Sequence, residues 1–216
     1  MDISVEKTIK ALSDNNINAC FVQSCEEAID IAKSLIKKGD VISHGGSVTL
    51  KEAGFTELFK NGDYNYLDRS APGLTDEDIE EIYRKTYYAD AFFSSANAIT
   101  ENGEIYNVDG HSNRVSALLF GPKKVIFIVG INKLTKDITA AARRVKEVAA
   151  PKNCVRLSKD TYCRKTGKCV TLNNENSDFC SGCTSEDRIC ANYTVMGRQQ
   201  LIGRVNVIII NKNLGF

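Results

Sequence analysis

Two runs of apolar residues constrain the fold of this chain more than any other feature of its sequence. Residues 125–129 are all apolar, and residues 205–210 are apolar apart from Asn206. A strand with one face in water alternates polar and apolar residues, whereas a strand without alternation needs cover on both faces. Helices packed on both faces of a mostly parallel sheet provide that cover. The sequence therefore predicts an α/β fold with a Rossmann-like, mostly parallel sheet sandwiched by helices.

The first 150 residues alternate helical and strand patterns, as such a fold requires. A capping box, Ser24 to Glu27, opens a helix that Gly39 ends. Residues 98–108 alternate around Asn102-Gly103, the dipeptide that best fits a tight hairpin turn. The other expected helices are 5–12, 48–59, 75–86 and 137–149, and the other expected strands are 19–22, 41–42, 64–67 and 91–93.

Length and charge limit the size of the core and the kinds of partner. The chain is long enough for one globular domain, 1–216, and its 28 Lys and Arg residues balance 27 Asp and Glu residues. A net charge of +1 produces no field that attracts nucleic acid or an anionic membrane surface. Residues 1–7 carry charges where a secretion signal is apolar, and no apolar stretch approaches the ~20 residues that span a bilayer. We expect a cytoplasmic protein that binds neither nucleic acid nor a membrane.

A glycine turn follows the strand predicted at 41–42. Gly45, Gly46 and Ser47 precede a predicted helix that contains Thr49. Backbone amides at the start of a helix favour phosphate or carboxylate groups, so the turn is a candidate anion site. A tight strand-to-helix connection is the alternative explanation of the two glycines. The chain contains neither the dinucleotide-binding glycine pattern nor the phosphate-loop pattern, so no nucleotide cofactor is expected.

Polar side chains gather after the strand predicted at 91–93. They supply hydrogen-bond donors, acceptors and both charges, and they are Asn97, Thr100, Glu101, Asp109, Asn113 and Arg114. Loops at strand ends form the ligand crevice of open α/β sheets, although a hairpin with ordinary turn residues and a surface ion pair is an alternative. The two histidines, His44 and His111, lie in glycine-containing turns, where each can act as an acid or base or remain simply hydrogen-bonded.

Four motifs together resemble those of a known family. In chain order they are Gly45-Gly46-Ser47-Val48-Thr49, Ala98-Ile99-Thr100-Glu101-Asn102-Gly103, Asp109-Gly110-His111-Ser112-Asn113-Arg114 and Gly121-Pro122-Lys123-Lys124-Val125-Ile126. In this order over residues 5–150, with a last strand returning at 205–216, they resemble the LUD domain of the lactate-utilisation proteins. Several spaced motifs in order are far more specific than any one of them.

The resemblance implies a fold and a role. The fold is that of the ribose-phosphate isomerase, CoA-transferase and formyltetrahydrofolate cyclo-ligase group, a Rossmann-like sheet with a pocket at the strand ends. The role is oxidation of L-lactate to pyruvate alongside iron–sulfur partner proteins. This chain is short, lacks a tandem ferredoxin-type cysteine run and carries cysteines of its own. The fold alone therefore does not transfer the reaction.

Six of the eight cysteines fall within residues 154–190. In a reducing compartment such clustering indicates metal or redox chemistry more than disulfides. We predict a small irregular cysteine-rich insertion, 151–196, before the last strand, with one metal site. Its expected ligands are Cys163, Cys183 and Cys190, and Cys169 and Cys180 compete for the fourth position. Zinc is slightly favoured over an iron–sulfur cluster, and free or redox-active thiols are the third interpretation. The remaining cysteines are expected to be packing residues: Cys20, Cys25 and Cys154.

Two classes of function follow from these features. In the first, the Gly45–Ser47 amides and Arg114 hold a small anionic organic metabolite, and the protein takes part in 2-hydroxy-acid oxidation or the associated electron transfer. Glu101 or Asp109 is then the base and His111 a proton carrier. In the second, the protein is a non-catalytic ligand-binding or redox sensor whose metal or thiol state controls its shape. A structural subunit beside an iron–sulfur partner protein, or a homo-oligomer, is a further alternative.

Overall fold

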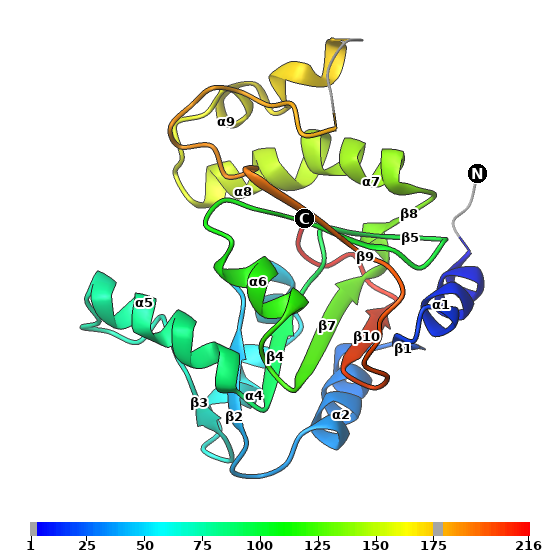
Figure 1. Ribbon diagram of the computed structural model, residues 1–216, viewed down its shortest axis with the longest axis vertical. Helices are drawn as coiled ribbons and strands as arrows, with labels where there is room; N and C mark the ends of the chain where they lie inside the picture. The colour runs from blue at the N-terminus through cyan, green and yellow to red at the C-terminus, as the bar shows by residue number, and fades with distance from the viewer. Residues whose placement is uncertain (1–3, 175–178) are drawn as a thin grey trace.

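A six-stranded sheet with only parallel strand pairs is the main layer of the structure, a computed structural model that describes residues 4–174 and 179–216. In spatial order its strands are β1 (Asn18–Val22), β10 (Val205–Ile210), β7 (Lys124–Gly130), β4 (Ala91–Ser94), β2 (Val41–His44) and β3 (Asn65–Tyr66). The two apolar runs form β7 and β10, which lie side by side within the sheet (Figure 1). Every residue of β10 is buried. The predicted parallel sheet is confirmed.

Helices cover both faces of this sheet. The α-helices are α1 (Val5–Asp14), α2 (Cys25–Leu35), α3 (Val48–Glu52), α4 (Phe55–Lys60), α5 (Asp76–Lys85), α6 (Asn113–Leu119), α7 (Ile138–Arg144), α8 (Ala150–Arg156) and α9 (Tyr162–Thr166). One apolar cluster packs α2 and α4 against Ile208, and a second packs Leu12 of α1 and Leu118 of α6 against Val207. Neighbouring strand residues point to opposite faces, so both faces are covered. None of the helices within the described residues is long and apolar enough to cross a membrane.

A second, smaller sheet lies beside the first and was not expected from the sequence. Its strands, in spatial order, are β8 (Leu134–Thr135), β5 (Ala98–Thr100), β6 (Ile105–Asp109) and β9 (Asn192–Met196). β5 and β6 form the antiparallel hairpin that Asn102-Gly103 predicts. Gly103 has a φ of 77°, and a Cβ there would lie 2.5 Å from the backbone of Ala11. The hairpin turn therefore packs directly on α1 and needs glycine.

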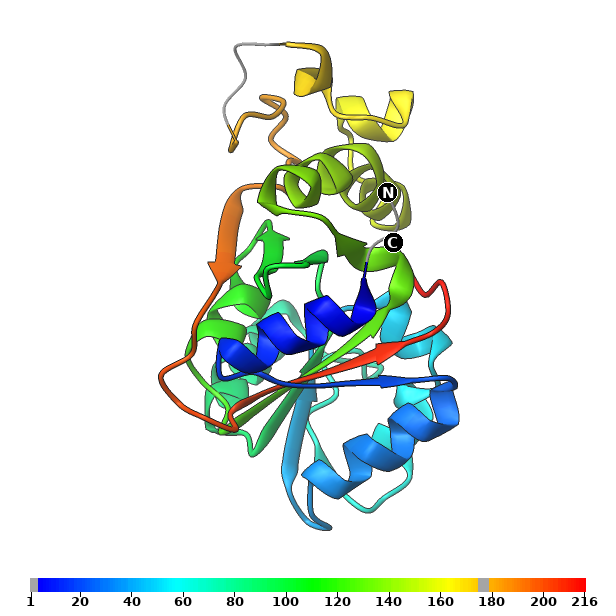
Figure 2. The ribbon, with the colours of Figure 1, turned by 90° about the vertical axis from the view of Figure 1, so that its right-hand side faces the viewer.

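The cysteine-rich segment is shorter and more regular than predicted. The helix expected to end at 149 continues through a π-helical turn, Val145–Ala149, into α8, and residues 192–196 form β9. The predicted insertion, 151–196, therefore contains most of a helix at its start and a strand at its end. Pro151 lies in the first turn of α8, where a missing amide is tolerated. Figure 2 shows α7, α8 and α9 stacked above the main sheet.

Candidate functional site

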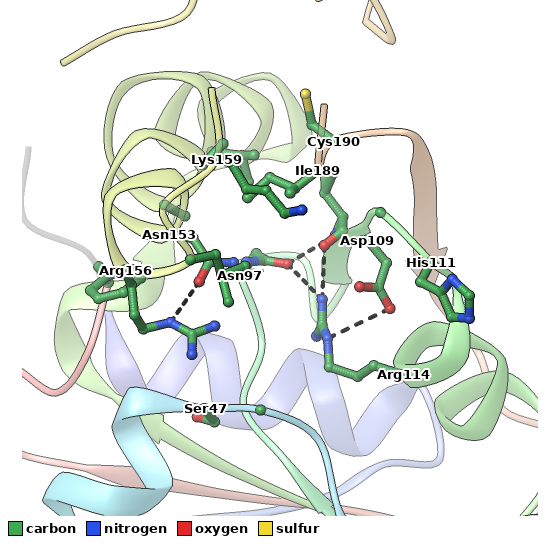
Figure 3. A pocket seen from close by; sticks show the side chains of 18 of the residues that line it. Ser47, Asn97, Asp109, His111, Arg114, Asn153, Arg156, Lys159, Ile189 and Cys190 are labelled. Atoms are coloured by element: carbon green, nitrogen blue, oxygen red, sulfur yellow. Dashed lines mark hydrogen bonds and ion pairs between the residues drawn. The ribbon is translucent and has the colours of Figure 1, made fainter. Parts of the chain in front are cut away.

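A pocket of about 500 Å³ opens where the main sheet meets α8 and the cysteine-rich segment. Its floor comes from the loops that follow β2 and β4, at the carboxyl ends of those strands. Its other walls come from the end of β6, from α8 and from residues 186–190 (Figure 3). The pocket thus lies at the strand ends, where open α/β sheets bind ligands.

The glycine turn shapes the pocket floor. A Cβ on Gly45 would lie 2.8 Å from Cδ of Arg114, and a Cβ on Gly46 would collide with the guanidinium of Arg69. The Gly45 amide donates to the carbonyl of Phe93 at 2.9 Å, so it is not free for a ligand. The Ser47 hydroxyl accepts from the amide of Leu50 and caps α3, a helix of five residues. Gly46, Ser47 and Thr49 line the pocket as predicted, but the turn mainly gives two arginines room to approach.

Arg114 holds the pocket wall together. Its guanidinium donates to Oδ1 of Asn107 at 2.8 Å, to Oδ1 of Asn97 at 3.1 Å, to the carbonyl of Val108 at 2.9 Å and to the carbonyl of Ser95 at 3.3 Å. Its Nε lies 3.9 Å from the carboxylate of Asp109. Because these contacts use its paired N–H donors, Arg114 has no free fork for a carboxylate ligand. In this structure Arg114 clamps two loops together.

Three other predicted residues line the pocket, and two of them, Asn97 and Asp109, serve the same clamp. The Asn97 side chain accepts from the amide of Val108 at 2.8 Å, and the Asp109 carboxylate accepts from the amide of Val115 at 3.1 Å, in the first turn of α6. Asn113 begins α6 and faces the pocket. These contacts fix the loop after β4 and the end of β6 relative to one another.

Glu101 and Thr100 lie outside the pocket. The Glu101 carboxylate accepts from Nζ of Lys7 at 3.1 Å and from the amide of Ser4 at 2.7 Å, which ties the hairpin to the start of α1. The Thr100 hydroxyl donates to the carboxylate of Glu104 at 2.6 Å within the turn. Neither residue is among the pocket lining. The structure therefore places the predicted base Glu101 and the predicted ligand contact Thr100 outside this pocket, at the hairpin turn that packs on α1.

We expect Glu101→Gln to leave anion binding unchanged and to lower the melting temperature slightly. The substitution removes the negative charge that faces Lys7 at the start of α1 but touches nothing in the pocket. Parallel melting curves and anion titrations of wild type and variant measure both effects. Loss of anion binding in a normally folded Glu101→Gln protein would contradict the placement of this residue.

The histidines differ in their access to the pocket. His111 lies at its mouth with an exposed ring, and Nε2 lies 2.8 Å from the carboxylate of Glu80. His44 is outside the lining: its Nδ1 donates to the carbonyl of Gly45 at 2.7 Å and its Nε2 accepts from the hydroxyl of Tyr66 at 2.6 Å. Burial lowers the pKa of His44. His111 therefore remains a proton-carrier candidate, and His44 serves as a hydrogen-bonded packing residue.

Five cationic side chains line the pocket beyond the residues predicted from the sequence, and they are Arg69, Lys133, Arg156, Lys159 and Arg188. Nζ of Lys133 donates to Oγ1 of Thr49 at 2.8 Å and to Oγ of Ser95 at 3.0 Å. Lys133 is 3 % exposed, and this burial, with the positive charges of two nearby arginines, lowers its pKa to about 7. Its position after the apolar strand β7 was the available signal, because strand-end loops carry functional groups.

Arg69 and Arg156 are two more of these unpredicted cations. Arg69 donates to the hydroxyl of Tyr83 at 2.9 Å and stacks on its ring. Arg156 donates to Oδ1 of Asn153 at 2.9 Å, and its guanidinium points into the pocket above Ser47 (Figure 3). Within residues 4–174 and 179–216, no carboxylate lies within ion-pair distance of Arg69, Lys133 or Arg156. The pocket therefore carries unneutralised positive charge.

Comparisons with known proteins establish the family. A family model described as the LUD domain matches residues 5–210. The chain belongs to the LUD domain family. A crystal structure of a DUF162 family protein from Deinococcus radiodurans is similar, with a TM-score of 0.51 and 15% sequence identity over 96% of this chain and 95% of that chain. At this identity the similarity shows the fold alone. No curated protein matches the chain.

The cysteines of this LUD domain fall into three groups. Four of them line a second cavity of about 20 Å³, and they are Cys163, Cys169, Cys183 and Cys190. Cys180 is exposed and does not line this cavity. The predicted packing residues Cys20 and Cys25 are partly buried against the core, and Cys154 is buried with Sγ 3.7 Å from Sγ of Cys163. Across the described residues, no three Cys, His, Asp or Glu side chains already gather closely enough to hold a metal ion.

Proposed function

We propose that this LUD domain binds a small carboxylate metabolite, of the 2-hydroxy-acid or 2-oxo-acid class, in its basic pocket. One observation carries the proposal: Arg69, Lys133 and Arg156 line the same pocket without a carboxylate partner among the described residues. Buried or half-buried cations are stabilised by an anion that pairs with them. A bound carboxylate supplies that anion.

The two arginines provide the carboxylate site. Burial lowers the pKa of Arg156, and the positive charge of Arg69 lowers it further, so the two guanidinium groups repel one another. An anion between them replaces this repulsion by attraction. Guanidinium groups also present paired N–H donors that match the two oxygens of a carboxylate. This site lies over Gly46 and Ser47, where the sequence predicts anion binding but attributes it to backbone amides.

Lys133 provides the proton-exchange group. A pKa of about 7 leaves this amine partly neutral at physiological pH, which suits a general base or acid. A 2-hydroxy acid carries its hydroxyl on the carbon next to the carboxylate, so a carboxylate held by the arginines directs that hydroxyl toward a neighbouring base. Oxidation of that carbon also needs an electron acceptor, and we assign this part to an iron–sulfur partner protein in the cytoplasm. Asp109 and His111 retain supporting roles at the wall and mouth of the pocket.

Titration calorimetry with a matched arginine control tests this function. L-Lactate, pyruvate, sulfate and a sugar phosphate are titrated into wild type, Arg156→Gln and Arg143→Gln. Arg143 is largely exposed on α7, pairs with Glu147 and does not line the pocket. We expect Arg156→Gln to weaken pyruvate or lactate binding about 10- to 100-fold, because a charged hydrogen bond is lost, and Arg143→Gln to bind like wild type. Equal affinities in all three proteins would contradict the assigned site.

A redox or metal sensor is the second candidate function. It is favoured by the position of Cys190, which lines both the basic pocket and the thiol-lined cavity. Chemistry at that sulfur is therefore able to reach the ligand. Product formation from a bound 2-hydroxy acid in the presence of an artificial electron acceptor separates the two functions. Turnover that depends on Lys133 supports the enzyme, and ligand binding without turnover supports the sensor.

A further inference from the structure

We propose that Cys163, Cys169, Cys183 and Cys190 bind one zinc ion, and that this ion holds one wall of the basic pocket in place. The metal site itself is independent of the proposed function, whereas its effect on ligand affinity rests on it.

The first observation is that four cysteines line a single cavity. The four thiols come from α9, from the residue before a 3-10 turn at Val170–Asn173, from the loop after residue 179 and from the residues before β9. Apolar and aromatic side chains complete the lining, among them Tyr106, Val145 and Tyr193. Four thiols in one apolar cavity match a tetrahedral structural zinc site.

The size of the cavity favours a single ion. A volume of about 20 Å³ is close to the ~10–15 Å³ that admits one water molecule. An iron–sulfur cubane, with its eight core atoms, needs more room. Zinc–sulfur bonds of about 2.3 Å draw the four sulfur atoms inward. Among the described residues no three of these side chains are close enough together to hold an ion, so zinc binding requires the thiols to turn toward one another.

The second observation selects the fourth ligand, which the sequence leaves open between Cys169 and Cys180. The backbone amide of Cys169 donates to the carbonyl of Lys146 at 3.0 Å, which fixes this residue against the π-helical turn beside the cavity. Cys180 is exposed, and its carbonyl accepts from Arg188 at 2.7 Å outside the cavity lining. The structure thus assigns the position to Cys169.

Binding of Zn²⁺ to the four thiols conserves charge and protons. Four thiols and one Zn²⁺ give a tetrathiolate complex of net charge −2 and release four protons. Arg188 lies at this site and offsets part of that charge, since its guanidinium donates to the carbonyls of Cys190 at 2.9 Å and Cys183 at 3.3 Å. No electron transfer is involved, because zinc has no redox chemistry.

The third observation gives the ion its role. Residues 186–190 form a wall of the basic pocket, and Cys183 and Cys190 bracket that wall segment. Lys159, which also lines the pocket, pairs with Asp187 in the same segment at 3.1 Å. An ion bound to both cysteines fixes both ends of the wall. Zinc removal is therefore expected to weaken anion binding without unfolding the main sheet.

Elemental analysis of single variants tests the ligand set. Wild type, Cys169→Ser and Cys180→Ser are purified under reducing conditions, and zinc, iron and acid-labile sulfide are measured per chain. We expect one zinc per chain in wild type and in Cys180→Ser, and loss of most of the zinc from Cys169→Ser. Circular dichroism verifies that each variant is folded. Cobalt substitution provides a second readout, since a tetrahedral tetrathiolate cobalt spectrum should form in wild type and Cys180→Ser.

Hydrogen exchange of the wild-type protein, measured with and without zinc, tests the same proposal without a variant. It therefore still decides the question if Cys169→Ser fails to fold. Chelation of zinc should speed exchange in residues 162–172 and 179–190 and leave β7 and β10 protected. Three results would overturn the proposal: protein without metal whose four thiols all react freely, bound iron with acid-labile sulfide, or equal zinc loss from Cys180→Ser and Cys169→Ser. An unchanged anion affinity after zinc removal would overturn the wall-holding role alone, provided that wild type binds the anion.

Discussion

Replacing Lys133 by methionine is expected to make the protein more stable at pH 7 relative to wild type than at pH 10. Burial lowers the pKa of Lys133 to about 7, from 10.5 for an ordinary lysine. Between these two pH values the unfolded chain holds the proton and the folded chain has released it, so the stability of wild type rises with pH across this window. Methionine removes this dependence.

The expected change is large. From pH 7 to pH 10 the unfolding free energy of wild type should rise relative to Lys133→Met by about 3 to 4 kcal/mol, since one pKa unit corresponds to about 1.4 kcal/mol. The lost hydrogen bonds to Thr49 and Ser95 subtract a constant amount at every pH. Urea denaturation of both proteins at three pH values measures the difference. Lys136→Met, at an exposed lysine nearby, is the control. A pH-independent difference for Lys133→Met would show that this amine titrates normally.

Replacing Arg114 by leucine is expected to destabilise the protein by about 3 to 5 kcal/mol, because a buried charge partner and its hydrogen bonds are removed together. The side chain of Arg114 is 13% exposed and faces Asp109, itself 17% exposed. Leucine removes the Arg114 donors from the Asn97 and Asn107 side-chain oxygens and from the Val108 carbonyl, and each of the two side-chain oxygens keeps only one backbone amide donor. The loss of these buried hydrogen bonds adds to the cost.

Denaturant unfolding at constant pH measures this loss. Arg114→Lys is expected to fall between wild type and Arg114→Leu, since an ammonium reaches fewer of the acceptors than a planar fork. If Arg114 instead acted as a free ligand group, Arg114→Leu would unfold at the denaturant concentration of wild type and lose anion binding alone. That outcome would contradict the clamp.

The main sheet could be predicted because its signal is local. The apolar runs 125–129 and 205–210 indicate by themselves that they are buried. In the second sheet only the β5–β6 hairpin has such a local signal, Asn102-Gly103. The rest of that sheet could not be predicted, because β9 pairs with β6 across a wide separation in sequence, with Asn107 opposite Thr194. Nothing in the polar, short β9 segment indicates that partner. The end of the cysteine-rich segment was also predicted to be irregular, because the pairing of β9 with β6 leaves no local pattern in the sequence.

The site could be placed from the sequence, but the roles of its residues could not be assigned. The rule that open α/β sheets bind ligands at the carboxyl ends of their strands correctly placed the pocket near Gly46 and Asp109. It also selected Arg114, whose donors turn out to be used by long-range acceptors that no local pattern shows. Lys133 was overlooked because a lysine after a strand is ordinary until its burial is known. The burial and the partners of the pocket cations thus depend on tertiary packing, which no short sequence motif shows.

A crystal structure of the protein with pyruvate or L-lactate is the most direct test of the proposed function. The account predicts ligand density in the basic pocket, with the carboxylate between Arg69 and Arg156 and the oxygen of the adjacent carbon within hydrogen-bond distance of Nζ of Lys133. An empty pocket at ligand concentrations far above those needed for other anion-binding proteins, or a carboxylate bound elsewhere on the molecule, would contradict it.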